Sequence, residues 1–342
     1  MHNLQSTSEA PSFTARRLLR GGHLQTLAGF FLLRSSQLPI PEDRYVEVAP
    51  GVKILCRCHW QADRRNALTI LVVHGLEGSS ESGYVIGVTQ KGLVAGMNVV
   101  RVNQRNCGGT DHLAPTLYNS SLSGDVGAVA RNVIEHDKVQ RVALVGFSMG
   151  GNLVLKTAGE WGRKAPPEFR AVAAVCPAMD LAASADALHL PGNRLYEQYF
   201  MVKLRRRFRQ KAKLFPGHFD AKRLRGIRSL RDFDDKITAY YCGFQGAVDY
   251  YARAAASNVV GQISVPGLIL HAANDPFIRI LPETRRKISA NPNLTFIECA
   301  DGGHCSFLAE ANGYDGRWAE RQVIDFLRRF WIRVSHRRST IE

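Results

Sequence analysis

The sequence predicts an α/β fold, with a mostly parallel central sheet, helices on both faces and a helical segment inserted after the sixth strand. Three observations predict it. Continuous apolar runs bounded by glycine alternate with amphipathic stretches, a pattern typical of strands buried on both faces of a parallel sheet. The alternation stops at residue 179 and resumes near residue 263. The 342 residues, of which 45% are hydrophobic and 22% charged, are enough for a large apolar core.

The first part of the core, residues 1–178, is predicted to begin with a hairpin and to continue in β-α-β order. Residues 44–60 alternate between polar and apolar side chains around Pro50 and Gly51, which indicates two paired strands. Apolar runs and helical spacing predict the elements that follow. Strands with their loops are expected at 67–80, 98–109, 141–148 and 171–180, and helices at 84–97, 121–137 and 149–162.

Residues 179–262 lack a buried-strand pattern, and we expect them to form a helical insertion that covers the functional site. Apolar residues of the insertion are expected to line the pocket beneath it, with Leu204, Phe208, Phe215, Tyr240 and Tyr241 as candidates. The second part of the core, residues 263–342, resumes the alternation. Here we expect strands with their loops at 264–276 and 293–304, and helices at 282–290 and 317–334. The chain is therefore expected to form one core with one insertion.

Ser148 is the predicted nucleophile, because residues 146–150 match G-x-S-x-G between a predicted strand and a predicted helix. At so sharp a turn the serine has a strained backbone. Side chains two residues before and after it would collide, so Gly146 and Gly150 are required. The hydroxyl then projects beyond the strand end, near the amides that begin the next helix. A glycine–serine pair by itself is also an ordinary turn.

A serine hydroxyl needs a base that removes its proton and an acid that orients the base. His304 follows the last predicted strand in a glycine-rich loop and is the predicted base. Asp275 follows the preceding strand and is the predicted acid. Asp180 and Asp301 are the alternatives. We favour Asp275, because Asp180 begins the insertion and Asp301 is too near His304 in the sequence to reach around its ring.

Two backbone amides are the predicted oxyanion hole, the pair of donors that acyl transfer requires. The amide of Met149 directly follows the nucleophile, and the amide of Leu76 lies in the loop after an earlier strand. His74 and Gly75, in the same loop, are the predicted substrate-binding residues. For His74 a structural role is the favoured interpretation, because backbone groups supply the oxyanion contacts.

Six stretches in this order resemble the α/β-hydrolase superfamily, in particular its YheT-like branch (AB hydrolase family 4). They are GGHLQTL (21–27), HGLEGSSES (74–82), NQRNCGG (103–109), GFSMGGN (146–152), HAANDPF (271–277) and DGGHCSF (301–307). The resemblance implies the α/β-hydrolase fold and carboxylic ester hydrolase activity. It also implies charge-relay residues at Ser148, Asp275 and His304. GGHLQTL is typical of the branch, and for His23 we expect a structural role.

Basic residues exceed acidic ones by 45 to 30, and thirteen of them lie between positions 194 and 231, beside only two acids. Three interpretations of this stretch remain open. It is a solvated helix face, a surface for anionic membrane lipid, or a nucleic-acid patch. The last is least favoured, because no helix-turn-helix or zinc-finger spacing accompanies the charge.

The sequence thus predicts a serine esterase that acts on short- to medium-chain acyl esters or glycerolipids. The alternatives are an acyltransferase or thioesterase with the same triad, and a non-catalytic lipid- or nucleic-acid-binding module. No cofactor and no metal are expected. The seven cysteines are expected to be reduced thiols. No apolar run approaches the ~20 residues that span a bilayer, so a cytoplasmic location is expected. The oligomeric state is left open.

Overall fold

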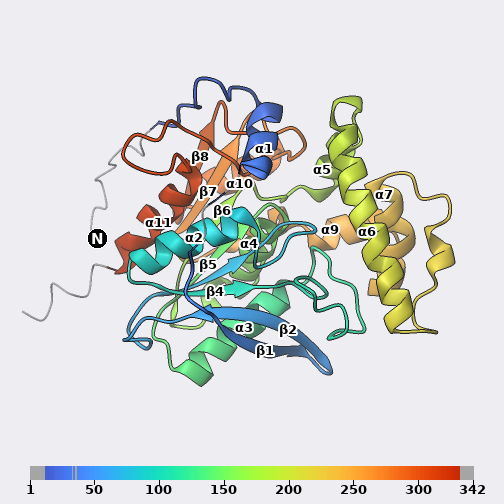
Figure 1. Cartoon of the computed structure of the whole chain (residues 1–342), viewed down its shortest axis with the longest axis horizontal. Helices are drawn as coiled ribbons and strands as arrows, with labels where there is room; N and C mark the ends of the chain where they lie inside the picture. The colour runs from blue at the N-terminus through green and yellow to red at the C-terminus, as the bar shows by residue number, and fades with distance from the viewer. Residues whose placement is uncertain (1–11, 33, 35–36, 332–342) are drawn as a thin grey trace, which may run out of the picture.

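The structure, a computed structural model, describes residues 12–32, 34 and 37–331 (Figure 1). An eight-stranded sheet lies at its centre, in the order β1-β2-β4-β3-β5-β6-β7-β8. The strands are β1 (Glu42–Ala49), β2 (Val52–His59), β3 (Thr69–Val73), β4 (Asn98–Val102), β5 (Val142–Phe147), β6 (Phe169–Val175), β7 (Gly267–Ala272) and β8 (Leu294–Cys299).

The sheet confirms the predicted mostly parallel architecture. The hairpin β1–β2 and the pair β2–β4 are antiparallel, and every other pairing is parallel. All residues of β3, β4, β5 and β7 are buried, which is why these strands are continuously apolar or nearly so. Since parallel strands end at the same edge, the loops after β3, β5, β7 and β8 meet there.

Helices cover both faces of the sheet, and side chains of each strand alternate between them. On one face α3 (Ser123–Asp137), α4 (Met149–Trp161) and α10 (Pro282–Ser289) pack against residues such as Leu71 and Val73. On the other face α2 (Gly83–Val94) and α11 (Trp318–Trp331) pack against residues such as Ile70 and Val72. Each face therefore has its own continuous apolar core.

Between β6 and β7 the described chain is helical, as the sequence predicts. The α- and π-helices are α5 (Leu181–Leu188), α6 (Arg194–Leu214), α7 (Leu230–Phe233), the π-helix η4 (Asp234–Ala239), α8 (Tyr240–Cys242) and α9 (Ala247–Ala254). Short 3-10 helices lie between them, at η2 (Pro191–Asn193) and η3 (Ala221–Leu224), and after them, at η5 (Ala256–Asn258) and η6 (Val260–Gln262). The α- and π-helices form a group beside the sheet, at the right of Figure 1, with a separate apolar cluster around Phe208 and Phe233. The boundaries 1–178, 179–262 and 263–342 stay predictions about domain organisation.

Two regions differ from the sequence prediction or extend it. Helix α1 (Gly22–Phe31) lies within GGHLQTL and the residues after it, where no element was predicted. The predicted C-terminal helix is α11, and residues 332–334 of that prediction lie outside the described residues. Among the helices that the structure describes, none combines the length and the apolar character needed to cross a bilayer.

Candidate active site

Ser148 occupies the turn between β5 and α4 with φ 54° and ψ −120°, a strained conformation for a residue with a side chain. The two flanking glycines are required by close backbone contacts. A Cβ atom on Gly146 would lie 2.2 Å from the carbonyl oxygen of Gly150, and one on Gly150 would lie 2.3 Å from that of Val73. The turn therefore has the steric form that the sequence predicts.

Asp275 and His304 come together at the carboxyl edge of the sheet. Oδ2 of Asp275 lies 2.8 Å from Nδ1 of His304. Oδ1 of Asp275 accepts hydrogen bonds from the backbone amides of Phe277, at 3.1 Å, and Ile278, at 2.9 Å. The carboxylate is fully buried and held from both sides, so it fixes the orientation of the imidazole ring.

The two alternative aspartates have other partners. Asp180 accepts hydrogen bonds from the amide of Leu281 and the hydroxyl of Thr284, both at 2.8 Å, at the start of α10. Asp301 accepts a hydrogen bond from the amide of Gly21 at 3.1 Å. Of the three candidates, Asp275 is the one whose carboxylate contacts the His304 ring.

No hydrogen bond joins the side chains of His304 and Ser148 in the described part of the chain. Nε2 of His304 is 3.8 Å from Sγ of Cys305. That thiol and the amide of Ser148 share one acceptor, the carbonyl oxygen of Val175, at 3.5 and 2.9 Å. The base and the candidate nucleophile therefore adjoin the same end of β6. In this structure Nε2 of His304 contacts Cys305.

Burial and charge act in opposite directions on the acid and the base. Burial disfavours the ionised form of Asp275, but His304 and the backbone amides outweigh it and lower the pKa of this carboxyl. Burial also disfavours a protonated His304, yet Cys305 and the carboxylate of Asp275 raise the pKa of the ring above its usual value. The pair is thus electrostatically suited to stabilise a cationic imidazole.

The loop after β3 carries the candidate oxyanion donor. Leu76 and Met149 line one pocket together with Ser148. Gly75 lies against the nucleophile, since a Cβ atom on it would be 3.0 Å from Cβ of Ser148. His74 is fully buried outside this pocket.

Both ring nitrogens of His74 have partners within the protein. Nδ1 contacts the carbonyl oxygen of Gly75 at 2.8 Å, and Nε2 accepts from the amide of Gln104 at 3.1 Å. Burial lowers the pKa of His74 to about 4, so the ring is neutral at physiological pH. These contacts favour the structural interpretation of His74 over a substrate contact.

Helix α1 supports the loops that carry Asp275 and His304, a role that the sequence did not indicate. A Cβ atom on Gly22 would lie 1.9 Å from the carbonyl oxygen of Asn274, and one on Gly303 would lie 2.5 Å from that of Gly22. Only glycine lets these backbones approach so closely. The start of α1 is thus in contact with the residues just before the acid and just before the base.

Side chains of α1 add hydrogen bonds to the same loops. Oγ1 of Thr26 accepts from the backbone amide of His304 at 2.8 Å. Gln25 is fully buried and binds both backbone groups of Leu308, accepting from its amide at 2.7 Å and donating to its carbonyl at 3.0 Å. His23 instead faces the insertion, where its ring stacks on Tyr196. These contacts explain GGHLQTL as a support for the site.

The insertion is fastened to the loops after β3 and β4 by buried charges. Arg207 of α6 donates to both carboxylate oxygens of Glu77, at 2.9 and 3.1 Å. Lys211, one turn further along, is fully buried and donates to Oδ1 of Asn106 at 3.0 Å and to the carbonyl of Asp111 at 2.8 Å. Two residues of the basic stretch therefore point inward, away from solvent.

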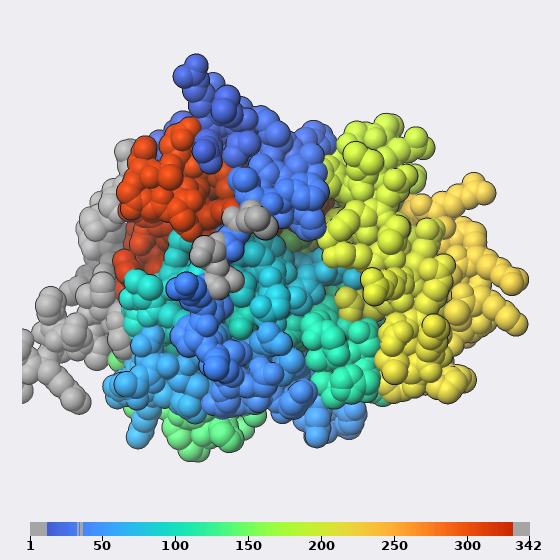
Figure 2. All heavy atoms as spheres, in the orientation of Figure 1, coloured from blue at the N-terminus to red at the C-terminus, as the bar shows by residue number. Residues whose placement is uncertain are grey.

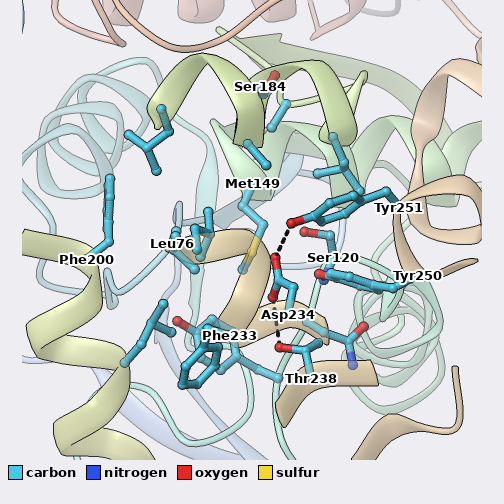
Figure 3. A pocket seen from close by; sticks show the side chains of 18 of the residues that line it. Leu76, Ser120, Met149, Ser184, Phe200, Phe233, Asp234, Thr238, Tyr250 and Tyr251 are labelled. Atoms are coloured by element: carbon cyan, nitrogen blue, oxygen red, sulfur yellow. Dashed lines mark hydrogen bonds between the residues drawn. The ribbon is translucent and has the colours of Figure 1, made fainter. Parts of the chain in front are cut away.

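The pocket beside Ser148 lies between the sheet edge and the insertion (Figure 3). Its wall is mostly apolar, with Leu204 and Phe208 of α6 and Phe277 from the loop of Asp275 among its members. Of the five residues that the sequence predicts to line the pocket, Leu204 and Phe208 do so. Phe215, Tyr240 and Tyr241 do not belong to this lining.

Two groups of side chains have ligand atoms close enough to hold a metal ion among the described residues. One comprises Cys176, His304 and Cys305, and the other Cys176, His271 and Asp275, with ligand atoms within 4.8 Å of one another. Thiolate and imidazole ligands suit a soft or borderline cation such as zinc. Because each group includes the acid or the base, a metal there would compete with proton transfer. The absence of a metal from the mechanism stays a prediction.

The fold and the site geometry indicate a class of protein, and a comparison with protein families shows the same class. The family of the alpha/beta hydrolase fold matches residues 69–311, and the chain belongs to this family. This membership confirms the resemblance drawn from the six sequence stretches.

Individual relatives share only about a quarter of their aligned residues with this chain. The chain is 27% identical over 336 residues to YheT, a proposed esterase of Escherichia coli (strain K12), with 94% of each chain covered. It is 28% identical over 250 residues to phospholipase ABHD3 of Mus musculus and 26% identical over 270 residues to monoacylglycerol lipase of Saccharomyces cerevisiae. The match covers 73% and 76% of this chain but only 60% and 59% of those two proteins.

Solved structures show the same fold at lower identity. An esterase of Pyrobaculum calidifontis superposes with a TM-score of 0.58 and 17% identity, covering 90% of this chain and 92% of that one. The Pyrococcus furiosus esterase Pf2001 superposes with a TM-score of 0.57 and 16% identity, covering 87% and 96%. At this identity the likeness bears on the fold alone.

Proposed function

We propose that the chain is a serine hydrolase that cleaves carboxylic esters, with Ser148 as nucleophile, His304 as general base and Asp275 as the acid that orients it. The observation that carries the proposal is the 2.8 Å contact between Asp275 and Nδ1 of His304, beside a serine held at φ 54° on a strand-to-helix turn. A carboxylate bound to Nδ1 favours the tautomer whose Nε2 is unprotonated, the form that accepts a proton from an alcohol.

In the proposed reaction the hydroxyl oxygen of Ser148 attacks the acyl carbonyl carbon while Nε2 of His304 takes the hydroxyl proton. The tetrahedral intermediate collapses, the bond to the leaving alkoxide breaks, and His304 returns the proton to the departing alcohol. A water molecule then attacks the acyl-serine by the same route and releases the acid. For the first step Nε2 must turn from Cys305 toward Ser148, and such contacts are often long in ligand-free enzymes and tighten on binding.

The amides of Leu76 and Met149 are the proposed oxyanion donors. Both residues line the pocket with Ser148, and in the described part of the chain neither amide has a protein acceptor. Removing one oxyanion donor typically lowers turnover by about 10²–10³-fold. The salt bridge between Arg207 and Glu77 holds the residue that follows Leu76, so it stabilises the loop conformation that presents this amide.

Hydrolysis of p-nitrophenyl butyrate and labelling by a fluorophosphonate probe test the proposal. We expect the wild type to hydrolyse the ester and to be labelled, and Ser148→Ala to lose both. Ser264→Ala, at an exposed position, is the matched control. Equal hydrolysis by wild type and Ser148→Ala would reject the mechanism. A protein that is never labelled but binds liposomes or DNA would instead be a non-catalytic module.

The proposed substrates are esters with an apolar acyl chain of short to medium length, including glycerolipids. The mostly apolar wall of the pocket supports this class, as do the names of the relatives, which are esterase, phospholipase and monoacylglycerol lipase. A panel of esters and thioesters of graded acyl length, assayed with added alcohol acceptors, separates ester hydrolysis from thioesterase and acyltransferase activity.

Helix α1 and the start of α6 are proposed to contact an anionic lipid surface. Figure 2 shows them meeting on one face of the molecule. Leu24, Leu27, Phe30 and Phe31 of α1 are exposed, and the ring centre of Phe30 lies 5.4 Å from that of Tyr199 on α6. Exposed apolar side chains gathered in one place are typical of an interaction surface.

Basic residues border this apolar face. Nζ of Lys203 lies 4.4 Å from the Tyr199 ring, and Arg206 and Arg209 are exposed on the same helix. Aromatic and basic residues together are typical of interfacial helices. Sedimentation with vesicles of phosphatidylglycerol is expected to exceed that with phosphatidylcholine and to fall in Phe30→Ser/Phe31→Ser. Ile40→Ser is the control for an exposed apolar residue elsewhere. The lipid-binding surface is rejected if Ile40→Ser loses as much vesicle binding as Phe30→Ser/Phe31→Ser. It is also rejected if the wild type binds both kinds of vesicle equally.

A further inference from the structure

One end of the pocket is polar, and the proposed reaction makes no use of it. Asp234, Thr238 and Tyr251 meet there, and Ser120 and Tyr250 lie beside them (Figure 3). In the view of Figure 3 these side chains lie on the right, opposite the apolar groups on the left. An unsubstituted alkyl chain makes no favourable contact with a buried carboxylate, because burial of a charge without a polar partner is costly.

Within the described part of the chain, the buried carboxylate of Asp234 has only hydroxyl groups as hydrogen-bond partners. Oδ1 accepts from Thr238 Oγ1 and Oδ2 accepts from Tyr251 OH, both at 2.8 Å. Among the described residues no lysine, arginine or histidine forms an ion pair with it. Burial raises the pKa of Asp234 to about 6, although the two hydroxyl groups act against the rise. Each carboxylate oxygen retains a second lone pair, so Asp234 can accept further hydrogen bonds.

The local backbone places these groups at the pocket. Asp234 begins the π-helix η4 and Thr238 lies four residues later on it. Short π-helical segments occur frequently at functional sites. Tyr251 comes from α9, and its neighbour Tyr250 accepts a hydrogen bond from the amide of Ser120 at 2.8 Å. A contact that only tied α9 to η4 would need no charge, because an asparagine pairs with a tyrosine at lower desolvation cost.

We propose that Asp234, supported by Thr238 and Tyr251, is a polar subsite that accepts a hydrogen bond from a hydroxyl group on the acyl chain, so that hydroxyacyl esters are the preferred substrates. This inference rests on the proposed ester hydrolysis and names the substrate class of that site. The apolar wall binds the methylene groups of the chain, and the subsite binds its hydroxyl. A perturbed carboxyl in a pocket of this kind is a recognised mark of a functional site.

Pairs of ethyl esters with and without one hydroxyl test the subsite. Ethyl 3-hydroxyhexanoate and 6-hydroxyhexanoate are compared with ethyl hexanoate, and ethyl 8-hydroxyoctanoate with ethyl octanoate, by proton release at constant pH. For each pair the measured quantity is the ratio of kcat/KM for the hydroxylated ester to that for the plain ester. A hydrogen bond to a charged group implies a preference of about tenfold or more. We expect such a ratio in the wild type for at least one pair.

Two substitutions and one control assign the preference to Asp234. Asp234→Leu removes the acceptor at similar volume, and Asp234→Asn keeps the shape without the charge. Both are expected to lower the ratio about tenfold, with folding checked by circular dichroism. Asp186→Asn alters an exposed carboxylate of α5, which pairs with Arg231, and is expected to keep the wild-type ratio.

The outcomes separate this inference from the proposed function. If the wild type cleaves plain esters in a Ser148-dependent way but favours no hydroxylated ester, the subsite is rejected and ester hydrolysis stands. A wild-type preference that survives in a folded Asp234 variant also rejects it. If the wild type cleaves no ester and is not labelled, both proposals fail. A wild-type ratio near one for every pair rejects the subsite even where neither variant folds.

Discussion

The active site is built between two regions that are held in place by different interactions. On the sheet side, the loops of Asp275 and His304 are fixed by strand ends and by α1, through close backbone contacts and hydrogen bonds to main-chain groups. On the side of the insertion, α6 is fixed by Arg207 and Lys211, whose charges are largely or fully buried against the core. The sheet side is held by close backbone contacts, and the insertion is held by buried charges.

This difference suggests a division of roles. Backbone contacts leave little freedom, which suits groups that must keep proton-transfer geometry. Buried charges are stable only while every partner is present, so one lost partner loosens the whole contact. We therefore expect changes on the sheet side to affect the chemical step, and changes on the insertion side to affect stability and the shape of the pocket.

Asp275→Asn is expected to have the largest effect, on the sheet side. The amide of asparagine cannot hold the ring with Nδ1 protonated as the carboxylate does, and loss of this partner in comparable triads lowers kcat about 10⁴-fold. The measurement is ester hydrolysis with folding checked by thermal denaturation. Asp43→Asn, on the edge strand β1, is the control. A fall of less than tenfold would remove Asp275 from the mechanism.

The same substitution predicts a shift in the pH profile. Hydrolysis needs neutral His304, so the rate rises as pH increases through the pKa of that ring. The carboxylate of Asp275 helps to raise this pKa, and Asp275→Asn is expected to lower it. The acidic limb of kcat/KM should move to lower pH in the variant. A limb that stays in place, or that moves to higher pH, would contradict the assigned base.

Arg207→Ala is expected to act mainly on stability, on the side of the insertion. It leaves the nearly fully buried carboxylate of Glu77 without its bidentate partner, which implies a loss of about 3 kcal/mol in the free energy of unfolding. Urea denaturation followed by circular dichroism measures it. Arg209→Ala, two residues along α6 and exposed, is the control. Equal midpoints for the two variants would show that charge does not hold this region.

The comparison also shows what the sequence could predict. The strands were predictable because full burial demands continuous apolar runs, and the turn at Ser148 because backbone clashes demand glycine at fixed spacing. These constraints act within a few residues of one another. They leave a local pattern in the chain, which sequence analysis can read.

The contacts of α1 and the insertion leave no such pattern. Thr26 meets His304 across 278 positions, and Arg207 meets Glu77 across 130. In the sequence, Arg207 and Lys211 look like the exposed basic residues beside them, and Asp234 looks like an ordinary surface acid. Their roles depend on which distant backbone folds against them, and a single sequence does not carry that information.

Thr26→Val is expected to have the smallest effect of these substitutions, and it tests a single hydrogen bond on the sheet side. It keeps the volume of the side chain but leaves the partly buried backbone amide of His304 without its acceptor, at a cost of about 1 kcal/mol. Because Thr26 does not line the pocket, the loss should appear as a roughly tenfold lower kcat at nearly constant KM, through a shifted ring.

Thr26→Ser is the matched control, because it restores the oxygen without the methyl group. If positioning of His304 explains the effect, the serine variant regains kcat while the valine variant does not, even where both denature at the same temperature. If both variants lose kcat together with stability, α1 supports the fold in general and has no particular role in aligning the base. The split between turnover and stability therefore decides whether GGHLQTL belongs to the catalytic apparatus or only to the scaffold.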